Sequence, residues 1–173
     1  MEIRTLTPDD ANEYWRLRLE ALQGDAAAFS ASAEEHMTLT MDEVRRRLGA
    51  DGAGMLVVGA FEDGVLVGMA GFYPEKGLKS RHKGRVWGVY VTPAKRGTGV
   101  GRKVLQTALD RGAATPGIEQ ILLSVTASQT AAIALYRSLG FESFGREPRA
   151  LKIGDQFVDE EYMILLLEGR KQG

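Results

Sequence analysis

The segment Val89–Arg102 constrains the fold of this chain more strongly than any other stretch. It reads Val-Tyr-Val-Thr-Pro-Ala-Lys-Arg-Gly-Thr-Gly-Val-Gly-Arg, an apolar run of β type that passes through a glycine-rich loop into a helical pattern. Glycines at 97, 99 and 101 leave their backbone N–H groups unshielded. The first turn of the following helix presents further unpaired N–H groups at the same place. This arrangement predicts an anion site suited to a pyrophosphate.

Two common phosphate-binding motifs do not match this loop. A P-loop requires G-x-x-x-x-G-K-[ST], and no glycine of the segment is followed by such a Gly-Lys pair. A dinucleotide fingerprint requires G-x-G-x-x-G, whereas the sequence from Gly97 reads G-x-G-x-G. The remaining pattern, Arg96-x-x-Gly99-x-Gly101, is short enough that an ordinary glycine-rich turn also fits it.

A second motif downstream favours a specific interpretation. The stretch Val125–Phe141 closely resembles V-x-x-x-N-x-x-A-x-x-L-Y-x-x-x-G-F, a signature of the GNAT superfamily of acyl-CoA N-acyltransferases. Arg96-x-x-Gly99-x-Gly101 matches the R/Q-x-x-G-x-G/A signature of the same superfamily, and the spacing of the two motifs also fits. The chain departs from the pattern at Gln129, where this family usually carries Asn. The resemblance extends over nearly the whole chain.

The order of predicted strands and helices is that of a mixed α/β protein. The turn signals Asp63-Gly64 and Gly154-Asp155 predict two hairpins. The order β-α-α-β-β-β-α-β-α-β-β predicts one domain over residues 1–173, with a central mixed sheet flanked by helices. The expected strands are Ile3–Leu6, Met55–Phe61, Val65–Phe72, Arg85–Val91, Ile118–Val125, Ala150–Ile153 and Phe157–Leu167.

Helices are expected where apolar residues recur at helical spacing. The first follows the N-cap Thr7, and the second opens with the capping box Thr40-Met41-Asp42-Glu43. Two more are expected at Gly99–Ala114 and Thr130–Leu139, whereas residues 24–39 show no clear period. The predicted apolar face of the first helix consists of Ala11, Trp15, Leu19 and Leu22.

Composition excludes several classes of function. With no cysteine there are no disulfides, thiolate metal sites or covalent cysteine intermediates. The longest apolar stretches are much shorter than the ~20 residues that span a bilayer, and no signal-peptide pattern follows Met1. A net charge of −1 gives no general attraction to nucleic acid, and His36 and His82 lack metal-ligand spacing. We therefore expect a cytoplasmic protein without a metal, membrane or nucleic-acid partner.

The resemblance implies acetyl-CoA as the cosubstrate and a defined set of contacts for it. In this family two central strands splay apart, here Arg85–Val91 and Ile118–Val125, and the pantetheine arm pairs with the exposed backbone of the first. Lys95 is a further candidate for the adenosine phosphates, and Lys103 a weaker one. The implied cofactor-binding residues are Val89, Tyr90, Val91, Arg96, Gly97, Thr98, Gly99, Val100, Gly101, Arg102 and Gln129.

The resemblance also implies that Tyr136 protonates the departing thiolate. A phenol, with a pKa near 10, donates to a thiolate of pKa about 8.5 only where that thiolate is poorly solvated. The acceptor amine must lose its proton before it attacks, yet the strand Arg85–Val91 carries no carboxylate. Glu34 and Glu35 are the first candidates for the general base, and Glu75, His82 and Asp159 are alternatives.

The expected function is transfer of acetyl from acetyl-CoA to a primary amine of a small molecule. Direct attack by the amine is expected because the chain has no cysteine to form an acyl-enzyme. The alternatives are an acetyltransferase for protein N-termini, of the ribosomal-protein type, and a non-catalytic acyl-CoA-binding module. A third alternative is a glycine-rich domain that binds a different phosphate ligand. The apolar final strand is compatible with a homodimer.

Overall fold

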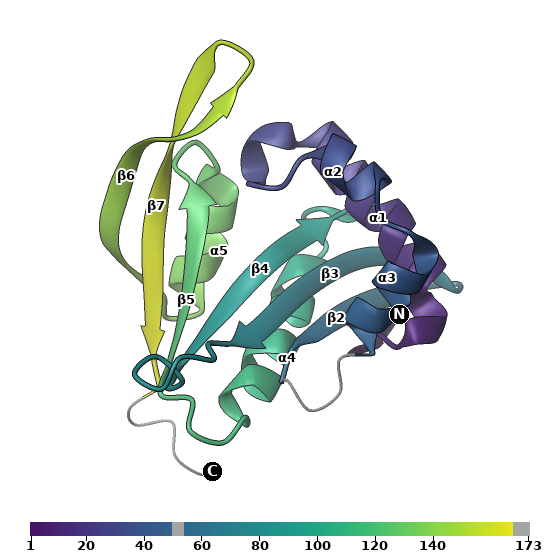
Figure 1. Ribbon diagram of the computed structural model, residues 1–173, viewed down its shortest axis with the longest axis horizontal. Helices are drawn as coiled ribbons and strands as arrows, with labels where there is room; N and C mark the ends of the chain where they lie inside the picture. The colour runs from purple at the N-terminus through teal and green to yellow at the C-terminus, as the bar shows by residue number, and fades with distance from the viewer. Residues whose placement is uncertain (50–53, 168–173) are drawn as a thin grey trace.

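The computed structural model describes residues 1–49 and 54–167, which form a seven-stranded sheet with helices packed on both faces (Figure 1). The strand order is β1-β2-β3-β4-β5-β7-β6, and within the described residues every neighbouring pair is antiparallel except β4 and β5. The predicted mixed α/β sheet is confirmed. The strands are β1 (Glu2–Thr5), β2 (Leu56–Glu62), β3 (Val65–Pro74), β4 (Lys83–Val91), β5 (Gln120–Thr126), β6 (Glu142–Ile153) and β7 (Gln156–Leu166).

The helices cover the two faces of the sheet from different parts of the chain. α1, α2 and α3 lie over one face of β2–β4, α4 lies behind the other, and α5 lies beside β5 (Figure 1). Their bounds are α1 (Ala11–Gly24), α2 (Ala33–Met37), α3 (Met41–Leu48), α4 (Val100–Ala113) and α5 (Thr130–Ser138), with 3-10 turns η1 (Pro8–Asp10), η2 (Ala26–Ala28) and η3 (Pro93–Lys95).

Local sequence signals account for several of these boundaries. Asp63 and Gly64 have φ values of 51° and 79°, as a two-residue type I′ turn requires, so the β2–β3 hairpin is confirmed. The capping box of α3 is also present: the backbone N–H of Thr40 donates to Oε2 of Glu43 at 2.7 Å, and that of Glu43 donates to Oγ1 of Thr40 at 3.3 Å.

Each face of the sheet buries its own apolar core. One core lies under α4 and α5 and includes Phe72, Leu105 and Met163; the other lies under α1 and α3 and includes Leu17 and Leu66. All five of these side chains are inaccessible to solvent. Because both faces are buried, the central strands read as nearly continuous apolar runs in the sequence.

Two predicted features of the helices are wrong in detail. Ala11 and Leu22 are buried as predicted, whereas Trp15 and Leu19 are only half-buried and Tyr14, Leu17 and Ala21 are buried instead. Arg18 is also buried on this face, and a search for apolar periodicity does not count a charged residue. The segment 24–39, for which no structure was expected, contains η2 and the short helix α2.

The last hairpin is longer than predicted. β6 begins at Glu142, eight positions before the expected start at Ala150, and it bends at a register shift between Glu147 and Leu151. The added residues 142–149 are all exposed on the edge of the sheet. Their sequence does not alternate between apolar and polar residues, as the sequence of a strand with one buried face would. Pairing with β7, and not burial, holds them in strand conformation.

Candidate active site

The central feature of the molecule is the divergence of β4 from β5. The two parallel strands pair only where Lys83–Arg85 faces Gln120–Leu122. Beyond that point they separate, and α5 and the loop before α4 border the opening between them (Figure 1). Among the residues that the structure describes, the backbone of β4 past Arg85 therefore has no partner strand on this side, and it offers N–H and C=O groups to an extended ligand. The splayed strands implied by the sequence resemblance are confirmed.

A β-bulge in β4 accompanies this separation. Trp87 pairs with Gly71 and Tyr90 pairs with Met69, so β4 carries one extra residue opposite Ala70 of β3. Gly88 lies in the bulge with φ of 62°, a conformation that non-glycine residues rarely adopt. Bulges bend and twist the strand that contains them. The bulge thus helps to turn the second half of β4 away from β5.

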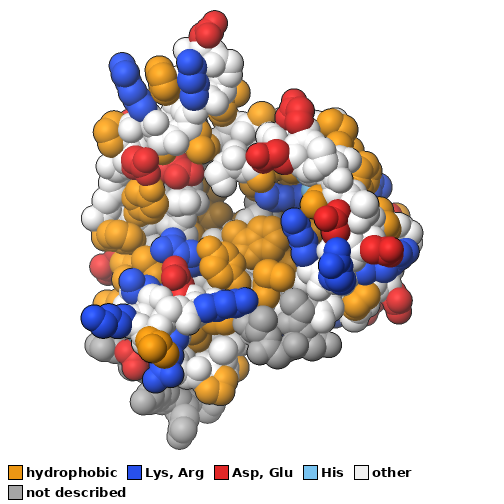
Figure 2. Space-filling view, viewed as in Figure 1, with side chains coloured by type: hydrophobic (Ala, Val, Ile, Leu, Met, Phe, Trp, Pro, Cys, Tyr) orange, Lys and Arg blue, Asp and Glu red, His pale blue; other side chains and the backbone are white. Residues whose placement is uncertain are grey.

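The opening contains a cavity of about 400 Å³, which we call the first cavity. It extends from the glycine loop to α5, and Figure 2 shows a hollow in this region whose floor is hydrophobic, with Lys or Arg side chains beside it. The sequence-predicted residues that line it are Val89, Tyr90, Val91, Arg96, Gly97, Gly99, Gly101, Arg102, Gln129 and Tyr136. Thr98 and Val100 do not line it: the Thr98 hydroxyl donates to the backbone of Lys95, and Val100 is 1% exposed in the core.

The glycine loop has the backbone geometry of an anion site. Gly97 and Gly99 have φ values of 75° and 84°, and Gly99 is the N-cap of the 14-residue helix α4. The first backbone N–H groups of α4 have no partner within the helix and lie at the positive end of its dipole. Together these donors could hold a phosphate or pyrophosphate group next to the open edge of β4.

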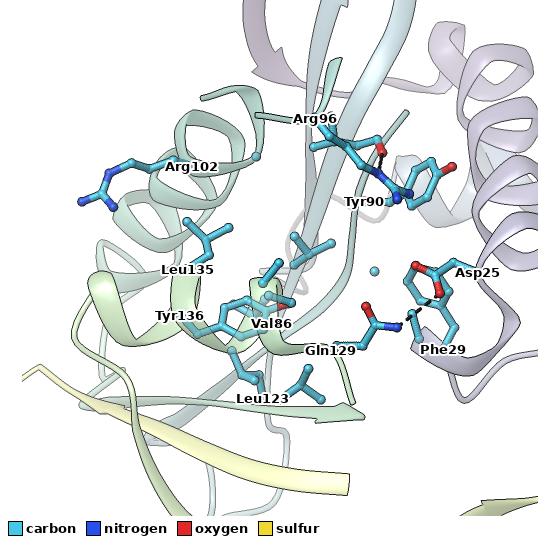
Figure 3. A pocket seen from close by; sticks show the side chains of 18 of the residues that line it. Asp25, Phe29, Val86, Tyr90, Arg96, Arg102, Leu123, Gln129, Leu135 and Tyr136 are labelled. Atoms are coloured by element: carbon cyan, nitrogen blue, oxygen red, sulfur yellow. Dashed lines mark hydrogen bonds between the residues drawn. The ribbon is translucent and has the colours of Figure 1, made fainter. Parts of the chain in front are cut away.

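The basic residues around the glycine loop form hydrogen bonds, ring contacts or ion pairs within the protein. Arg96 donates from Nε to the backbone oxygen of Val91 at 3.1 Å, and its guanidinium lies over the Tyr90 ring at 5.5 Å. Lys95 forms an ion pair with Glu62. Arg102 donates to the hydroxyl of Ser138 at 2.7 Å. Arg96 and Arg102 both border the first cavity, and Figure 3 shows them on opposite sides of it.

Tyr136 projects from α5 into the first cavity, toward Val86 of β4 (Figure 3). Its side chain is 7% exposed and packs edge-on against Phe141 at 6.0 Å. Burial raises the pKa of Tyr136 to about 12, because an ionised phenol would lose its hydration there. The phenol therefore stays protonated at neutral pH, with its hydroxyl available as a hydrogen donor.

Gln129 and Asp25 lie next to each other in the lining of the first cavity (Figure 3). Nε2 of Gln129, the N-cap of α5, donates to Oδ1 of Asp25 at 3.3 Å. Nearby, the hydroxyl of Thr126 donates to the backbone oxygen of Ala27. Asp25 thus brings a carboxylate to the wall of the cavity that Tyr136 enters. The sequence analysis missed it because residues 24–39 show no periodic pattern.

The structure does not bring the other candidate bases to the first cavity. Glu34 and Glu35 are exposed on α2, and the carboxylate of Glu35 accepts a hydrogen bond from the backbone of Ser32. Glu75 accepts from Arg85 at 2.6 Å and lines a different cavity together with His82. Asp159, in β7, accepts from the side chain of Arg146 and the backbone of Arg149.

A second cavity, of about 630 Å³, is lined by residues of α1, α2, α3, β2 and β4. Trp87 lines both this cavity and the first, so the two adjoin at the β4 bulge. His36 borders it, stacked on Trp15 at 5.4 Å with Nε2 3.0 Å from the backbone oxygen of Trp15. Burial lowers the pKa of His36, and the nearby cations Arg18 and Arg47 lower it further.

Comparisons with known proteins agree with this geometry. N-alpha-acetyltransferase RimI of Mycobacterium tuberculosis is 38% identical over 96 residues, which cover 56% of this chain and 58% of that protein. A mycothiol acetyltransferase of Thermobispora bispora is 32% identical over 146 residues, covering 82% of this chain and 46% of that protein. The chain spans between 36% and 58% of the length of these and another curated relative.

The fold has counterparts among solved structures. The structure of yncA from Salmonella typhimurium, determined with its cofactor acetyl-CoA, has a TM-score of 0.85 and 25% sequence identity; the match covers 100% of this chain and 97% of that one. Within residues 1–49 and 54–167, no helix has the length and apolar character needed to cross a membrane. A model of the acetyltransferase (GNAT) family matches residues 13–141, which include the glycine loop and Tyr136. The chain belongs to the acetyltransferase (GNAT) family.

Proposed function

We propose that this protein transfers an acetyl group from acetyl-CoA to a primary amine of a small molecule, by direct attack of the amine. One observation carries the proposal: a single cavity joins the unpaired backbone edge of β4, the amide donors of the glycine loop and the buried phenol of Tyr136. An extended thioester needs all three: the loop amides for its pyrophosphate, the β4 edge for the arm, and the phenol for the sulfur at the far end.

The residues of the first cavity fit acetyl-CoA. In the proposal, the backbone of Val89 and Val91 pairs with the pantetheine arm, and the amides of residues 97–102 hold the pyrophosphate. Arg96 and Arg102 border the same space and supply positive charge for the phosphates. When bound, acetyl-CoA supplies the activated acetyl thioester. The relative that was solved with acetyl-CoA supports this assignment.

Two side chains are proposed to move protons. Tyr136 donates its proton to the leaving sulfur, which would otherwise become a poorly solvated thiolate in a largely apolar cavity. Asp25 receives the proton that the amine must lose, because its carboxylate lines the same cavity as Tyr136. Glu35 is the alternative base: it borders the second cavity, which adjoins the first at Trp87.

Free-thiol release with a panel of amines tests this function directly. The proposal requires that acetyl-CoA be consumed faster with at least one small-molecule amine than without it, and that the acetylated amine be recovered. Thermal shift with acetyl-CoA, ATP and NAD, each alone, tests the ligand separately. Stabilisation by acetyl-CoA without turnover of any amine or peptide would leave a non-catalytic acyl-CoA-binding module. Stabilisation by ATP or NAD but not by acetyl-CoA would overturn the proposal.

Acetylation of protein N-termini is the second candidate function. The likeness to N-alpha-acetyltransferase RimI supports it. Peptides with free and with blocked N-termini, included in the same assay, separate the two functions. Turnover of the free peptides at higher kcat/KM than any small amine would favour the second candidate.

A further inference from the structure

Arg18 is a buried cation for which the described residues provide no hydrogen-bond acceptor. Its side chain leaves α1 with 8% of the residue exposed, and Nη1 is fully buried without a partner. The guanidinium lies over the ring of Phe29 at 4.9 Å and that of Trp87 at 5.6 Å. Aromatic faces attract the cation but accept no conventional hydrogen bond in its plane. Burial lowers the pKa of Arg18, and the side chain of Tyr14 opposes this effect.

A second buried donor lies beside it. Nε1 of Trp87 is also fully buried without a hydrogen-bond partner among residues 1–49 and 54–167. Arg18 and Trp87 both line the second cavity. Buried donors without acceptors are costly and uncommon in folded proteins. Two such donors, in side chains that line one cavity, favour a bound group with acceptor oxygens, which reaches these atoms once the side chains shift to admit it.

We propose that the second cavity binds the acceptor amine and that Arg18, with Trp87, holds a carboxylate group of that acceptor. The acceptor is then an amino acid or a similar amine-bearing carboxylic acid. This inference rests on the proposed acetyl transfer and narrows its substrate class. A planar guanidinium matches a carboxylate through paired, charge-assisted hydrogen bonds, which makes it more selective than a single ammonium group.

The position of Arg18 suits an acceptor that carries its amine on the carbon bonded to its carboxylate. A Cβ added at Gly88, in the β4 bulge, would lie 3.4 Å from Nη1 of Arg18. Gly88 itself lines the first cavity. In an α-amino acid the amine is carried by the carbon bonded to the carboxylate. A carboxylate held at Arg18 would therefore keep the amine near the boundary of the two cavities.

The remaining wall of the second cavity indicates what else the acceptor carries. Part of that wall is apolar or aromatic and part is polar or charged. The apolar or aromatic contributors include Tyr14, Leu22, Leu39, Leu48 and Val57, and the polar ones are Ser32, Glu35, His36 and Arg47. The apolar part fits an uncharged side chain of the acceptor. A polyamine would instead place an additional cation near Arg18, which the charge of the guanidinium disfavours.

The test compares each amino acid with the amine that lacks only its carboxylate. Suitable pairs are L-leucine with 3-methylbutylamine, L-methionine with 3-(methylthio)propylamine, and L-phenylalanine with 2-phenylethylamine. We expect at least one amino acid to exceed its matched amine in kcat/KM by about tenfold or more, because the amine leaves both buried donors unpaired. Equal or higher kcat/KM for every carboxylate-free amine would overturn the inference while leaving acetyl transfer intact.

Variants test whether Arg18 and Trp87 cause the preference for acceptors that carry a carboxylate. In Arg18→Met the ratio of kcat/KM between acid and amine should fall toward one, and Trp87→Phe should reduce it in part. Arg46→Met, which removes an exposed arginine of α3 outside the cavity lining, is the matched control and should keep the ratio. A ratio that is unchanged in both Arg18→Met and Trp87→Phe contradicts the assignment. If Arg18→Met does not fold, Trp87→Phe decides alone.

Calorimetric binding of the amino acids separates this inference from the proposed function. Binding to the wild type that is lost in Arg18→Met, while acetyl-CoA still binds the variant, supports the carboxylate site even if no thiol is released. In that case the proposed transfer fails and the carboxylate site stands. Absence of amino-acid binding to the wild type, with acetyl-CoA present or not, overturns the site.

Discussion

Gln129 donates a hydrogen bond from Nε2 to Oδ1 of Asp25 at 3.3 Å, which joins the start of α5 to the end of α1 at the first cavity. The GNAT signature usually carries Asn at the position of Gln129. Here the longer amide contacts a carboxylate beside it in the cavity lining (Figure 3). Asp25 is therefore held in place at the cavity and accepts a hydrogen bond through one of its two oxygens.

Replacing Asp25 by Asn tests whether its charge takes part in the reaction. Asn retains an Oδ1 that accepts from Gln129, so the contact survives while the base is removed. We expect kcat to fall by about 10²-fold, the range of a lost general base, with little change in the affinity for acetyl-CoA. Steady-state kinetics and acetyl-CoA titration measure the two quantities.

Glu35→Gln tests the alternative base directly. Glu35 is an exposed carboxylate on α2 that borders the second cavity, and if Asp25 is the base, its loss should lower kcat much less than Asp25→Asn does. A fall in kcat for Glu35→Gln without one for Asp25→Asn would transfer the role of base to Glu35. That outcome would support the first choice made from the sequence.

Tyr136→Phe removes a hydroxyl that is buried in the first cavity without a change in ring packing. We expect kcat to fall by roughly 10²-fold or more, while acetyl-CoA binding changes little. Because the pKa of Tyr136 is raised to about 12, its ionisation should cause no loss of activity at pH 9 or 10. Tyr73→Phe, at a tyrosine that is 37% exposed on β3, is the control. An unaltered kcat in Tyr136→Phe, with chemistry rate-limiting, would exclude Tyr136 as the acid.

Two parts of the candidate site could be predicted from the sequence: the part that depends on backbone groups of glycines, and the part that belongs to a motif with fixed spacing. The glycine loop and Tyr136 lie within such patterns, and most of the predicted residues there line one cavity. Asp25 and Arg18 were not predicted as site residues, because their positions depend on contacts with segments distant in sequence: Gln129 for the former, Phe29 and Trp87 for the latter.

The fold, too, was predicted correctly where neighbouring residues decide the structure and incorrectly where contacts with distant segments decide it. The turn at Asp63-Gly64 and the capping box at Thr40 are decided by neighbouring residues, and both were predicted correctly. The first part of β6 is exposed throughout and is held by its pairing with β7, which no local pattern records. The buried face of α1 was placed correctly at Ala11 and Leu22 but not between them, where the charged residue Arg18 belongs to it.

Gly112→Ala should destabilise the protein although alanine usually favours a helix. A Cβ at Gly112 in α4 would lie 2.6 Å from the ring of Phe72, which is fully buried on β3. Overpacking of this kind typically costs about 1–3 kcal/mol, more than the 0.5–1 kcal/mol or so that alanine contributes over glycine in a helix. Urea unfolding of the variant and the wild type measures the difference.

A double-mutant cycle with Phe72→Leu identifies the cause. The smaller side chain makes room for the new methyl group, so the combined variant should be more stable than the sum of the two single effects predicts. Gly24→Ala, at the end of α1 with nothing within 4 Å of its added Cβ, should be neutral or stabilising. Additive effects of Gly112→Ala and Phe72→Leu would show that contact with the ring is not responsible.

His36 should make the stability of the protein depend on pH on the acid side of neutrality. Its folded pKa is lowered from the ordinary value of 6.5, chiefly by burial and further by Arg18 and Arg47. Between the folded and unfolded pKa values the unfolded chain binds a proton that the folded chain does not, so stability falls as pH decreases from about 6.5. Above that value neither state is protonated at His36, and its contribution is constant. Urea unfolding at a series of pH values should show this slope in the wild type and a smaller one in His36→Gln, whose amide can still donate to the backbone of Trp15. Identical slopes in the two proteins would contradict the prediction.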